Sequence, residues 1–232
     1  MWRTIILSLV TGCVCFAASS DSPEGTWATQ IVGKDHGVCY LTFSNNAAVT
    51  GYGIAVDALG PFLVAGTWDF DAKGKVVAGF TQFINTGSAG AQLQGKVNNN
   101  KLRAKVKSTG GPFNLKGSPP SDIADLTGAW TAEGKQRGKP VFYSFSAALS
   151  SNTPAWFDLS GAGNNNTGPF TLTGGILITP DNRVAAYTVY DYGGSTETSA
   201  FSGKLVKRGN KLVLRGKTDT HQKVSIRAER AP

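Results

Sequence analysis

The feature that most constrains the fold of this chain is that its second half repeats its first half. The matches are Gly25-Thr26-Trp27 with Gly128-Ala129-Trp130, Gly60-Pro61-Phe62 with Gly168-Pro169-Phe170, and Asn100-Lys101-Leu102 with Asn210-Lys211-Leu212. The offset between the copies grows from 103 to 108 and then to 110 residues, which indicates slightly longer turns in the second copy. An ordered series of matches across a whole half is typical of a duplicated structural unit.

The repeat divides the 232 residues into two domains. We place the first at residues 24–119 and the second at residues 125–232, with a linker at residues 120–124. Pro119 and Pro120 stand at the junction. Because proline lacks a backbone donor and has a fixed φ, neither a helix nor a strand is expected to continue through it. Each copy has about 100 residues, enough for a hydrophobic core of its own.

Each copy is expected to fold as a meander of short β-strands. In the first copy the sequence predicts eight strands, at residues 25–32, 38–43, 48–56, 62–70, 75–84, 91–97, 101–107 and 112–116. The breaks between them are rich in Asn and Gly, which are favoured in tight turns. No stretch shows helical periodicity over three turns. We therefore predict an all-β protein of two tandem antiparallel up-and-down β-barrels with little helix.

Alternation along the strands indicates which side chains face the barrel interior. In the fourth strand Phe62, Val64 and Trp68 lie on one face, and Phe170 occupies the matching place in the second copy. We expect Trp68 to be buried with Phe62, so that Trp68→Ala would lower the free energy of unfolding by about 3–5 kcal/mol. Glycines recur on the same faces and are typical of strands that bend strongly to close a small barrel.

A meander of eight short strands whose first strand carries Gly25-Thr26-Trp27 resembles the calycin group, the lipocalins and avidins. In that group the tryptophan of such a Gly-x-Trp motif closes one end of the barrel, and the resemblance places Trp27 and Trp130 there. No further lipocalin signature and none of the avidin ligand residues can be placed in this chain. The resemblance therefore implies a fold and no particular ligand.

An eight-stranded barrel has an interior that is either just filled by side chains or able to hold one small ligand. We predict a small apolar ligand in each interior, held by Trp27, Trp68 and Phe62 in the first copy and by Trp130 and Phe170 in the second. A void of about 300 Å³ or more would favour this role. Strands that pack large residues throughout would instead favour a structural or surface-interaction protein.

The sequence lacks the motifs that mark common enzyme and metal sites. His36 and His221 do not correspond between the copies and belong to no HExxH or His-x-His pair, so no zinc site is predicted. Cys39 lies in a predicted strand, where a thiol is expected to behave as a small hydrophobic group. Nucleophile-elbow and phosphate-loop patterns are absent as well. We therefore expect a non-catalytic protein without a metal or cofactor.

Basic residues gather in the last strands of both copies. Residues 91–119 carry six Lys and Arg and no Asp or Glu, and residues 199–232 carry nine against two. The predicted outer-face patch consists of Lys96, Arg103, Lys105, Lys107, Lys204, Arg215 and Lys217. It is either a solubilising face that opposes edge-to-edge association or a site for an anionic component of the cell envelope. No basic-aromatic motif of a nucleic-acid-binding sheet is present, so nucleic acid is not expected as a partner.

The first residues have the pattern of a secretory signal peptide, which we place at residues 1–19. One basic residue, Arg3, precedes an apolar stretch that is too short to cross a bilayer, and small residues follow it. Val10-Thr11-Gly12-Cys13 is also similar to a lipobox, in which a lipid on Cys13 would anchor the protein. The remaining chain has no apolar run of transmembrane length.

The sequence therefore predicts an exported, non-catalytic binding protein, periplasmic or extracellular. Its partner would be a small apolar ligand inside the barrels, an anionic partner on the basic outer face, or both. The alternative is a structural or cell-surface interaction protein with filled barrels and no small ligand.

Overall fold

The computed structural model describes residues 21–57, 60–84, 87–136, 139–165, 167–218 and 223–230. The expected signal peptide, Cys13 and His221 lie outside these ranges. The first eight strands are β1 Gly25–Gly33, β2 Gly37–Phe43, β3 Ala48–Ala55, β4 Gly60–Phe70, β5 Val76–Ile84, β6 Gly87–Asn98, β7 Lys101–Ser108 and β8 Phe113–Ser118. The other eight are β9 Gly128–Gln136, β10 Lys139–Leu149, β11 Trp156–Asn165, β12 Gly168–Ile178, β13 Arg183–Asp191, β14 Thr196–Arg208, β15 Lys211–Thr218 and β16 Lys223–Arg230. Within the described ranges no helix is long and apolar enough to cross a membrane.

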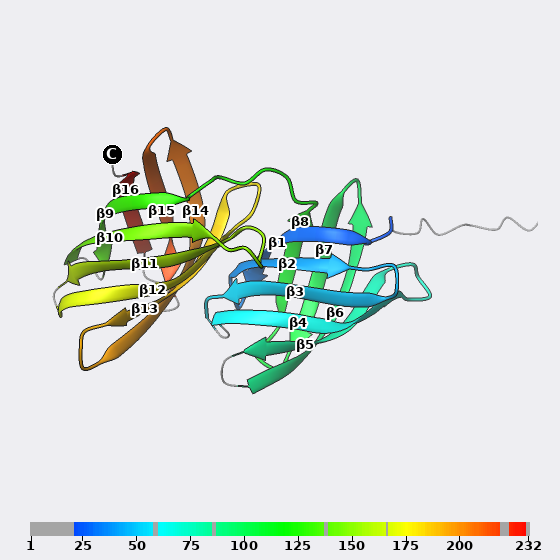
Figure 1. Cartoon of the computed structure of the whole chain (residues 1–232). Helices are drawn as coiled ribbons and strands as arrows, with labels where there is room; N and C mark the ends of the chain where they lie inside the picture. The colour runs from blue at the N-terminus through cyan, green and yellow to red at the C-terminus, as the bar shows by residue number, and fades with distance from the viewer. Residues whose placement is uncertain are drawn as a thin grey trace, which may run out of the picture.

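The sixteen strands form two closed, eight-stranded antiparallel barrels (Figure 1). Each strand pairs with its neighbour along the chain, and the last strand of each barrel pairs with the first, β8 with β1 and β16 with β9. The segment between β8 and β9 carries the chain from one barrel to the other (Figure 1). The predicted fold class of two tandem up-and-down barrels is confirmed.

Alternation along the strands separates an apolar interior from a polar outer face. In β6, Ala91, Leu93 and Val97 are buried, and the polar residues between them are exposed. The two residues that join β6 to β7, Asn99 and Asn100, have φ values of 49° and 55°. Because a two-residue hairpin of this kind needs positive φ at both positions, asparagine suits the turn. The turn residues and the alternation of β6 therefore both favour the observed pairing of β6 with β7.

The strand registers show where the two copies differ. The tripeptide match at Asn210-Lys211-Leu212 reflects a turn and not the register of the strands. The place of Leu102, opposite Val97, is taken in the second barrel by Leu214, opposite Leu205. The hairpin of β14 and β15 is therefore longer than the hairpin of β6 and β7, which accounts for part of the growing offset between the copies.

The two barrels pack against each other through apolar side chains that point outward from their strands. The cluster consists of Ala28, Val38, Tyr40, Ile54, Ala155, Leu177 and Ala185. The Tyr40 hydroxyl donates a hydrogen bond of 2.7 Å to the backbone oxygen of Ile178, and the Tyr52 hydroxyl donates one of 2.7 Å to that of Pro154. Both phenols therefore reach from the first barrel to the backbone of the second.

Candidate functional site

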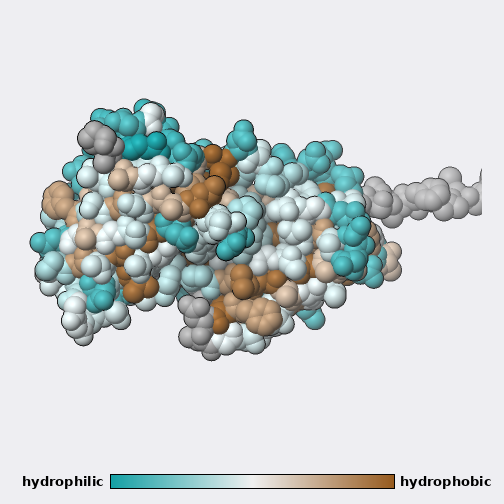
Figure 2. Space-filling model, viewed as in Figure 1, coloured by the Kyte–Doolittle hydropathy of each residue, from teal (hydrophilic) through white to brown (hydrophobic). Residues whose placement is uncertain are grey.

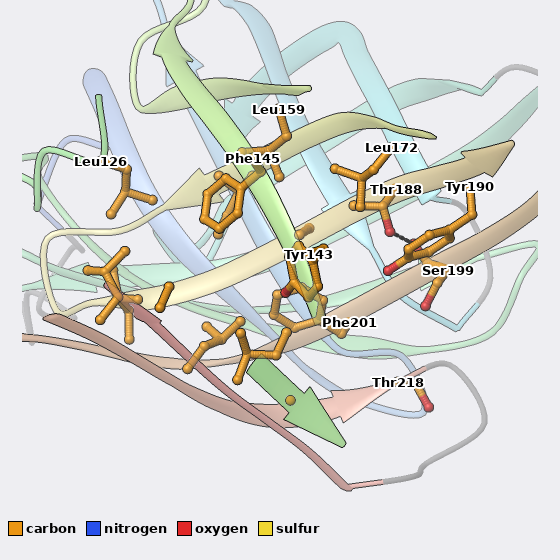
Figure 3. Close-up of a pocket in the computed structure, with 18 of the residues that line it drawn as sticks. Leu126, Tyr143, Phe145, Leu159, Leu172, Thr188, Tyr190, Ser199, Phe201 and Thr218 are labelled. Carbon is orange, nitrogen blue, oxygen red and sulfur yellow. Dashed lines mark hydrogen bonds between the residues drawn. The ribbon is translucent and has the colours of Figure 1, made fainter. Parts of the chain in front are cut away.

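A cavity of about 110 Å³ lies inside the second barrel. Its wall is mostly apolar and aromatic, and residues of β10 to β14 make up much of it: Tyr143, Phe145, Leu159, Leu172, Ile176 and Phe201. Figure 3 shows the rings of Tyr143 and Phe145 turned into this space, with Thr188, Tyr190 and Ser199 grouped on one side. This volume does not reach the void of about 300 Å³ that would favour the predicted ligand role. An apolar cavity of about 150 Å³ binds benzene, so this smaller one is limited to one small ring at most.

The interior of the first barrel carries larger side chains than the second at two of the places that line the cavity. Buried Ile31 in β1 and Phe80 in β5 belong to its core cluster. The strand registers give Gly134 as the counterpart of Ile31 and Thr188 as the counterpart of Phe80, and both replacements line the cavity. At these two places the second barrel has smaller side chains than the first, whereas Tyr143 and Phe201 are larger than their counterparts Cys39 and Leu93.

The two barrels also differ in the register between their last and first strands, which is the seam that closes each barrel. In the first barrel Gly117 of β8 pairs with Thr29 of β1. Its counterpart in the second barrel, Ile226, pairs with Gly134 and not with Ala132, the counterpart of Thr29. The seam is therefore displaced by two residues along the first strand. At a fixed number of strands, stagger, tilt and diameter are linked, and the greater stagger of the second barrel gives a wider interior.

Polar groups gather on one side of the cavity. The hydroxyl of Thr188 donates a hydrogen bond of 3.2 Å to the backbone oxygen of Ser199 (Figure 3). Burial raises the pKa of the Tyr143 phenol above its usual range. Burial likewise raises the pKa of Tyr190, although a hydrogen bond with Thr188 partly opposes it. Both phenols are therefore neutral at physiological pH, so each has a hydroxyl that can donate a hydrogen bond.

The predicted aromatic residues of the second barrel, Trp130 and Phe170, pack against residues of the cavity wall but do not line the cavity. Trp130 stacks on Phe145, with ring centroids 6.4 Å apart, and Phe170 meets the ring of Tyr190 edge-on at 5.0 Å. Trp130 is 1% exposed. These residues support the side chains that line the cavity, whereas the lining residues Tyr143, Thr188 and Ser199 were missed by the sequence analysis.

The two Gly-x-Trp motifs form the same local structure in both barrels. The Nε1 atom of Trp27 donates a hydrogen bond of 2.6 Å to the backbone oxygen of Pro23, four residues earlier. Trp130 donates an equivalent bond of 2.8 Å to Leu126. Both indoles are buried where the first strand of the barrel begins. Neither they nor Phe62, which is part of the first barrel's core, line the cavity.

The structure corrects the expected burial of Trp68. Its side chain lies on the same face as Phe62 but is only partly buried. Residues 69 and 70 at the end of β4 are exposed. The Trp68 ring packs edge-on against Phe43 at 6.0 Å, and its Nε1 donates a hydrogen bond of 2.9 Å to the backbone oxygen of Ser44. Trp68 therefore covers the rim of the barrel and is not part of its fully buried core.

Trp68→Ala is consequently expected to lower the free energy of unfolding by about 1–3 kcal/mol, less than the 3–5 kcal/mol typical of a fully buried aromatic residue. Phe62→Ala is the comparison, because Phe62 is 4% exposed and should show the full loss. Urea denaturation of both variants measures the difference. Equal losses would show that the rim is as tightly packed as the interior.

The predicted basic residues all stand on outer faces, as their exposure shows. Lys96, Arg103 and Lys105 line one groove on the first barrel, whereas Lys107 lies beyond it on β7. Lys204 pairs with Arg215 on the second barrel, and Lys217 follows on β15. Figure 2 shows hydrophilic side chains over the upper end of the second barrel, where Figure 1 places β14 and β15.

A second cluster of polar groups was not predicted from the sequence. Ligand atoms of Asp35, His36 and Asp57 lie within 4.8 Å of one another at one end of the first barrel. One Asp35 carboxylate oxygen accepts hydrogen bonds from the backbone N–H groups of His36, at 2.7 Å, and Asp57, at 2.9 Å. Nδ1 of His36 lies 2.5 Å from a carboxylate oxygen of Asp57. The three side chains therefore form a hydrogen-bonded cluster that joins the residues next to β2 and β3. Burial raises the pKa of the Asp35 carboxyl group.

Cys39 is buried inside the first barrel, and its sulfur lies 2.8 Å from the hydroxyl oxygen of Thr29. Burial raises the pKa of its thiol to about 12. The thiol is therefore protonated at physiological pH. Because the thiolate is the nucleophilic form, this environment does not activate Cys39.

No protein-family model and no curated protein matches this chain. Some solved structures are similar to it. A redesigned β-barrel, mFAP1, bound to DFHBI is 18% identical with a TM-score of 0.38, and the match covers 45% of this chain and 94% of that one. A de novo designed fluorescence-activating β-barrel is 17% identical with a TM-score of 0.37, and the match covers 47% of this chain and 100% of that one.

Proposed function

We propose that the protein is an exported, non-catalytic binding protein whose second barrel encloses a small, mostly apolar ligand with one polar substituent. The observation that carries the proposal is the hollow interior of the second barrel, where Gly134 and Thr188 stand in place of Ile31 and Phe80. The volume of about 110 Å³ limits the ligand to one small ring at most, and phenol is the probe for this class. Export rests on the N-terminal sequence pattern alone.

The chemistry of the wall supports a ligand of this class. Aromatic and aliphatic side chains surround most of the cavity and would exclude water from an apolar ring. The hydroxyls of Tyr190 and Ser199 stand on one side of it and supply hydrogen-bonding groups for a polar substituent. A few placed polar groups in an apolar wall are typical of small-molecule sites.

Phenol is expected to stabilise the protein, because a ligand that binds only the folded state shifts the unfolding equilibrium. At about ten times its Kd the gain should be about 1.4 kcal/mol, measured as a rise in Tm. Thr188→Phe should abolish the gain, since it restores the side chain that fills the first barrel. Thr198→Phe is the control, because Thr198 lies exposed on the same barrel and outside the cavity wall.

Ser199→Ala tests whether a hydroxyl of the cavity wall recognises the polar substituent of the ligand, because it removes that hydroxyl without filling the cavity. Ala91 is the counterpart of Ser199 in the first barrel, so the substitution suits the strand. It should weaken phenol binding and leave benzene binding unchanged. If wild type and Thr188→Phe respond equally to phenol, or neither responds to phenol or benzene, the cavity is not a ligand site.

The alternative, a structural or surface-interaction protein, draws support from the first barrel. Its interior is packed with its own side chains, including Phe43 at 1% and Phe62 at 4% exposure. A protein of this kind would act through its outer faces and would not respond to phenol.

A further inference from the structure

A row of three cations crosses the outer face of the first barrel. Lys96 of β6 pairs with Arg103 of β7, and Arg103 pairs in turn with Lys116 of β8. Directly paired residues have Cβ atoms about 4.5–5.5 Å apart, so the three side chains start side by side. All three are exposed, and none belongs to an ion pair found among the described residues. We call Lys96, Arg103 and Lys116 the cationic row.

A solubilising role does not explain this arrangement. Like charges directly opposite each other on neighbouring strands destabilise a sheet. The same three charges spread over the surface would keep the protein soluble without that repulsion. The second barrel has a different row, in which Arg183, Lys204 and Arg215 are paired in turn and Ser225 stands in the place of Lys116. Arg183 lies 3.6 Å from a carboxylate oxygen of Asp181, so one charge of that row is neutralised.

The cationic row lies in a groove of about 740 Å³. Its wall combines cations with side-chain amides: Gln94, Lys96, Asn98, Arg103, Asn114 and Lys116. The lining contains no acidic and no aromatic residue. Cations attract anionic groups, and amides both donate to and accept from hydroxyls. The groove therefore has the chemistry to bind a molecule with many hydroxyls and repeated negative charges.

We propose that this groove binds a linear acidic polysaccharide that carries a carboxylate on successive sugars. A chain of this kind fits along a groove and meets cations placed about one strand spacing apart, about 4.8 Å. Proteins that bind single-stranded nucleic acid stack bases on aromatic side chains, which this groove lacks. A bilayer surface is broad and would contact protruding side chains more readily than a concave wall. The site is separate from the cavity in the second barrel.

The test is binding of the full chain to polygalacturonate, with neutral dextran as the uncharged control. Between 0.01 M and 0.15 M salt the Debye length falls from about 30 Å to about 8 Å, so we expect the Kd to rise about tenfold or more. Replacing Lys96, Arg103 and Lys116 together with Gln should weaken binding at low salt by about tenfold. The Tm of this variant should be unchanged or slightly higher, because the repulsion within the row is removed.

The matched control variant replaces Lys204, Arg215 and Lys217 with Gln and removes the same charge from the second barrel. It should change the Kd by less than about threefold. Equal losses in the two variants would show that net charge, and not the groove, attracts the polymer. Equal or tighter binding to vesicles of phosphatidylglycerol and phosphatidylcholine would overturn the choice of a polysaccharide. Thr188→Phe should bind polygalacturonate as wild type does, so failure of this proposal is distinct from failure of the ligand proposal.

Discussion

Replacing Gly174 with Ala is expected to lower the free energy of unfolding by about 2–4 kcal/mol. Gly174 lies in β12 with its φ at +155°, which L side chains rarely adopt. A Cβ there would lie 2.1 Å from the backbone oxygen of Tyr187 and 2.9 Å from the Cα of Thr188. Because both obstacles are backbone atoms of the paired strand β13, no side-chain rotation relieves the clash. The two strands would have to separate.

The control for this prediction is Gly194→Ala in the loop between β13 and β14. A Cβ at Gly194 meets no atom within 4 Å, so the change should alter the free energy of unfolding by no more than about 0.5 kcal/mol. Urea denaturation followed by tryptophan fluorescence measures both variants. A Gly174→Ala protein as stable as Gly194→Ala would mean that β12 and β13 are farther apart than the structure shows.

Gly174 illustrates how far the sequence predicts the fold. The recurrence of glycines on the interior faces of the strands correctly indicated a small, tightly curved barrel. The specific cause, contact between a glycine and the backbone of the next strand, needed the register between strands. The first barrel shows the same contact, where a Cβ at Gly66 would lie 2.1 Å from the backbone oxygen of Gly79. Alternation predicts the face of a residue but not its partner on the neighbouring strand.

The start of β6 shows a second limit. Residues 87–90 are small and read as a break, yet they belong to the strand, because β5 pairs with them from Ile84 opposite Gly87 onward. Tertiary pairing here outweighs the weak strand propensity of Gly, Ser and Ala.

The cavity was not predicted, although the offsets of 103 and 108 residues already align Gly134 with Ile31 and Thr188 with Phe80. Large aromatic residues were expected to hold a ligand, but Trp130 and Phe170 pack against lining residues and do not line the cavity themselves. The informative positions are small residues, Gly134 and Thr188, and their smallness matters only beside their counterparts in the first barrel. Comparing the two copies at these offsets would have revealed both.

The contact between barrels did leave a signal in the sequence. Val38-Cys39-Tyr40-Leu41 is an unbroken apolar run, and six of the seven residues of β2 are buried. Runs without alternation are typical of strands covered on both faces. One face of β2 belongs to the barrel interior, and Tyr40 on the other meets the second barrel.

Leu177→Ala is expected to lower the free energy of unfolding by about 2–5 kcal/mol, the range for emptying a fully buried leucine site. Leu177 points outward from β12, yet it is 0% exposed because Tyr40 and its neighbours in the first barrel cover it. Tyr40→Phe removes only the hydrogen bond to the backbone oxygen of Ile178, at 2.7 Å, and leaves that oxygen without its partner. Its loss should be about 1–3 kcal/mol.

The comparison for Leu177→Ala is Thr173→Ala, because Thr173 points outward from the same strand but is exposed. That change should stay within about 0.5 kcal/mol. Urea midpoints of the three variants give the free energies, and limited proteolysis of the segment between β8 and β9 reports whether the barrels separate. Leu177→Ala should be cut faster than wild type, since a weakened contact opens more often. If Leu177→Ala matches Thr173→Ala in both measurements, the barrels do not stay docked in solution and behave as two independent units.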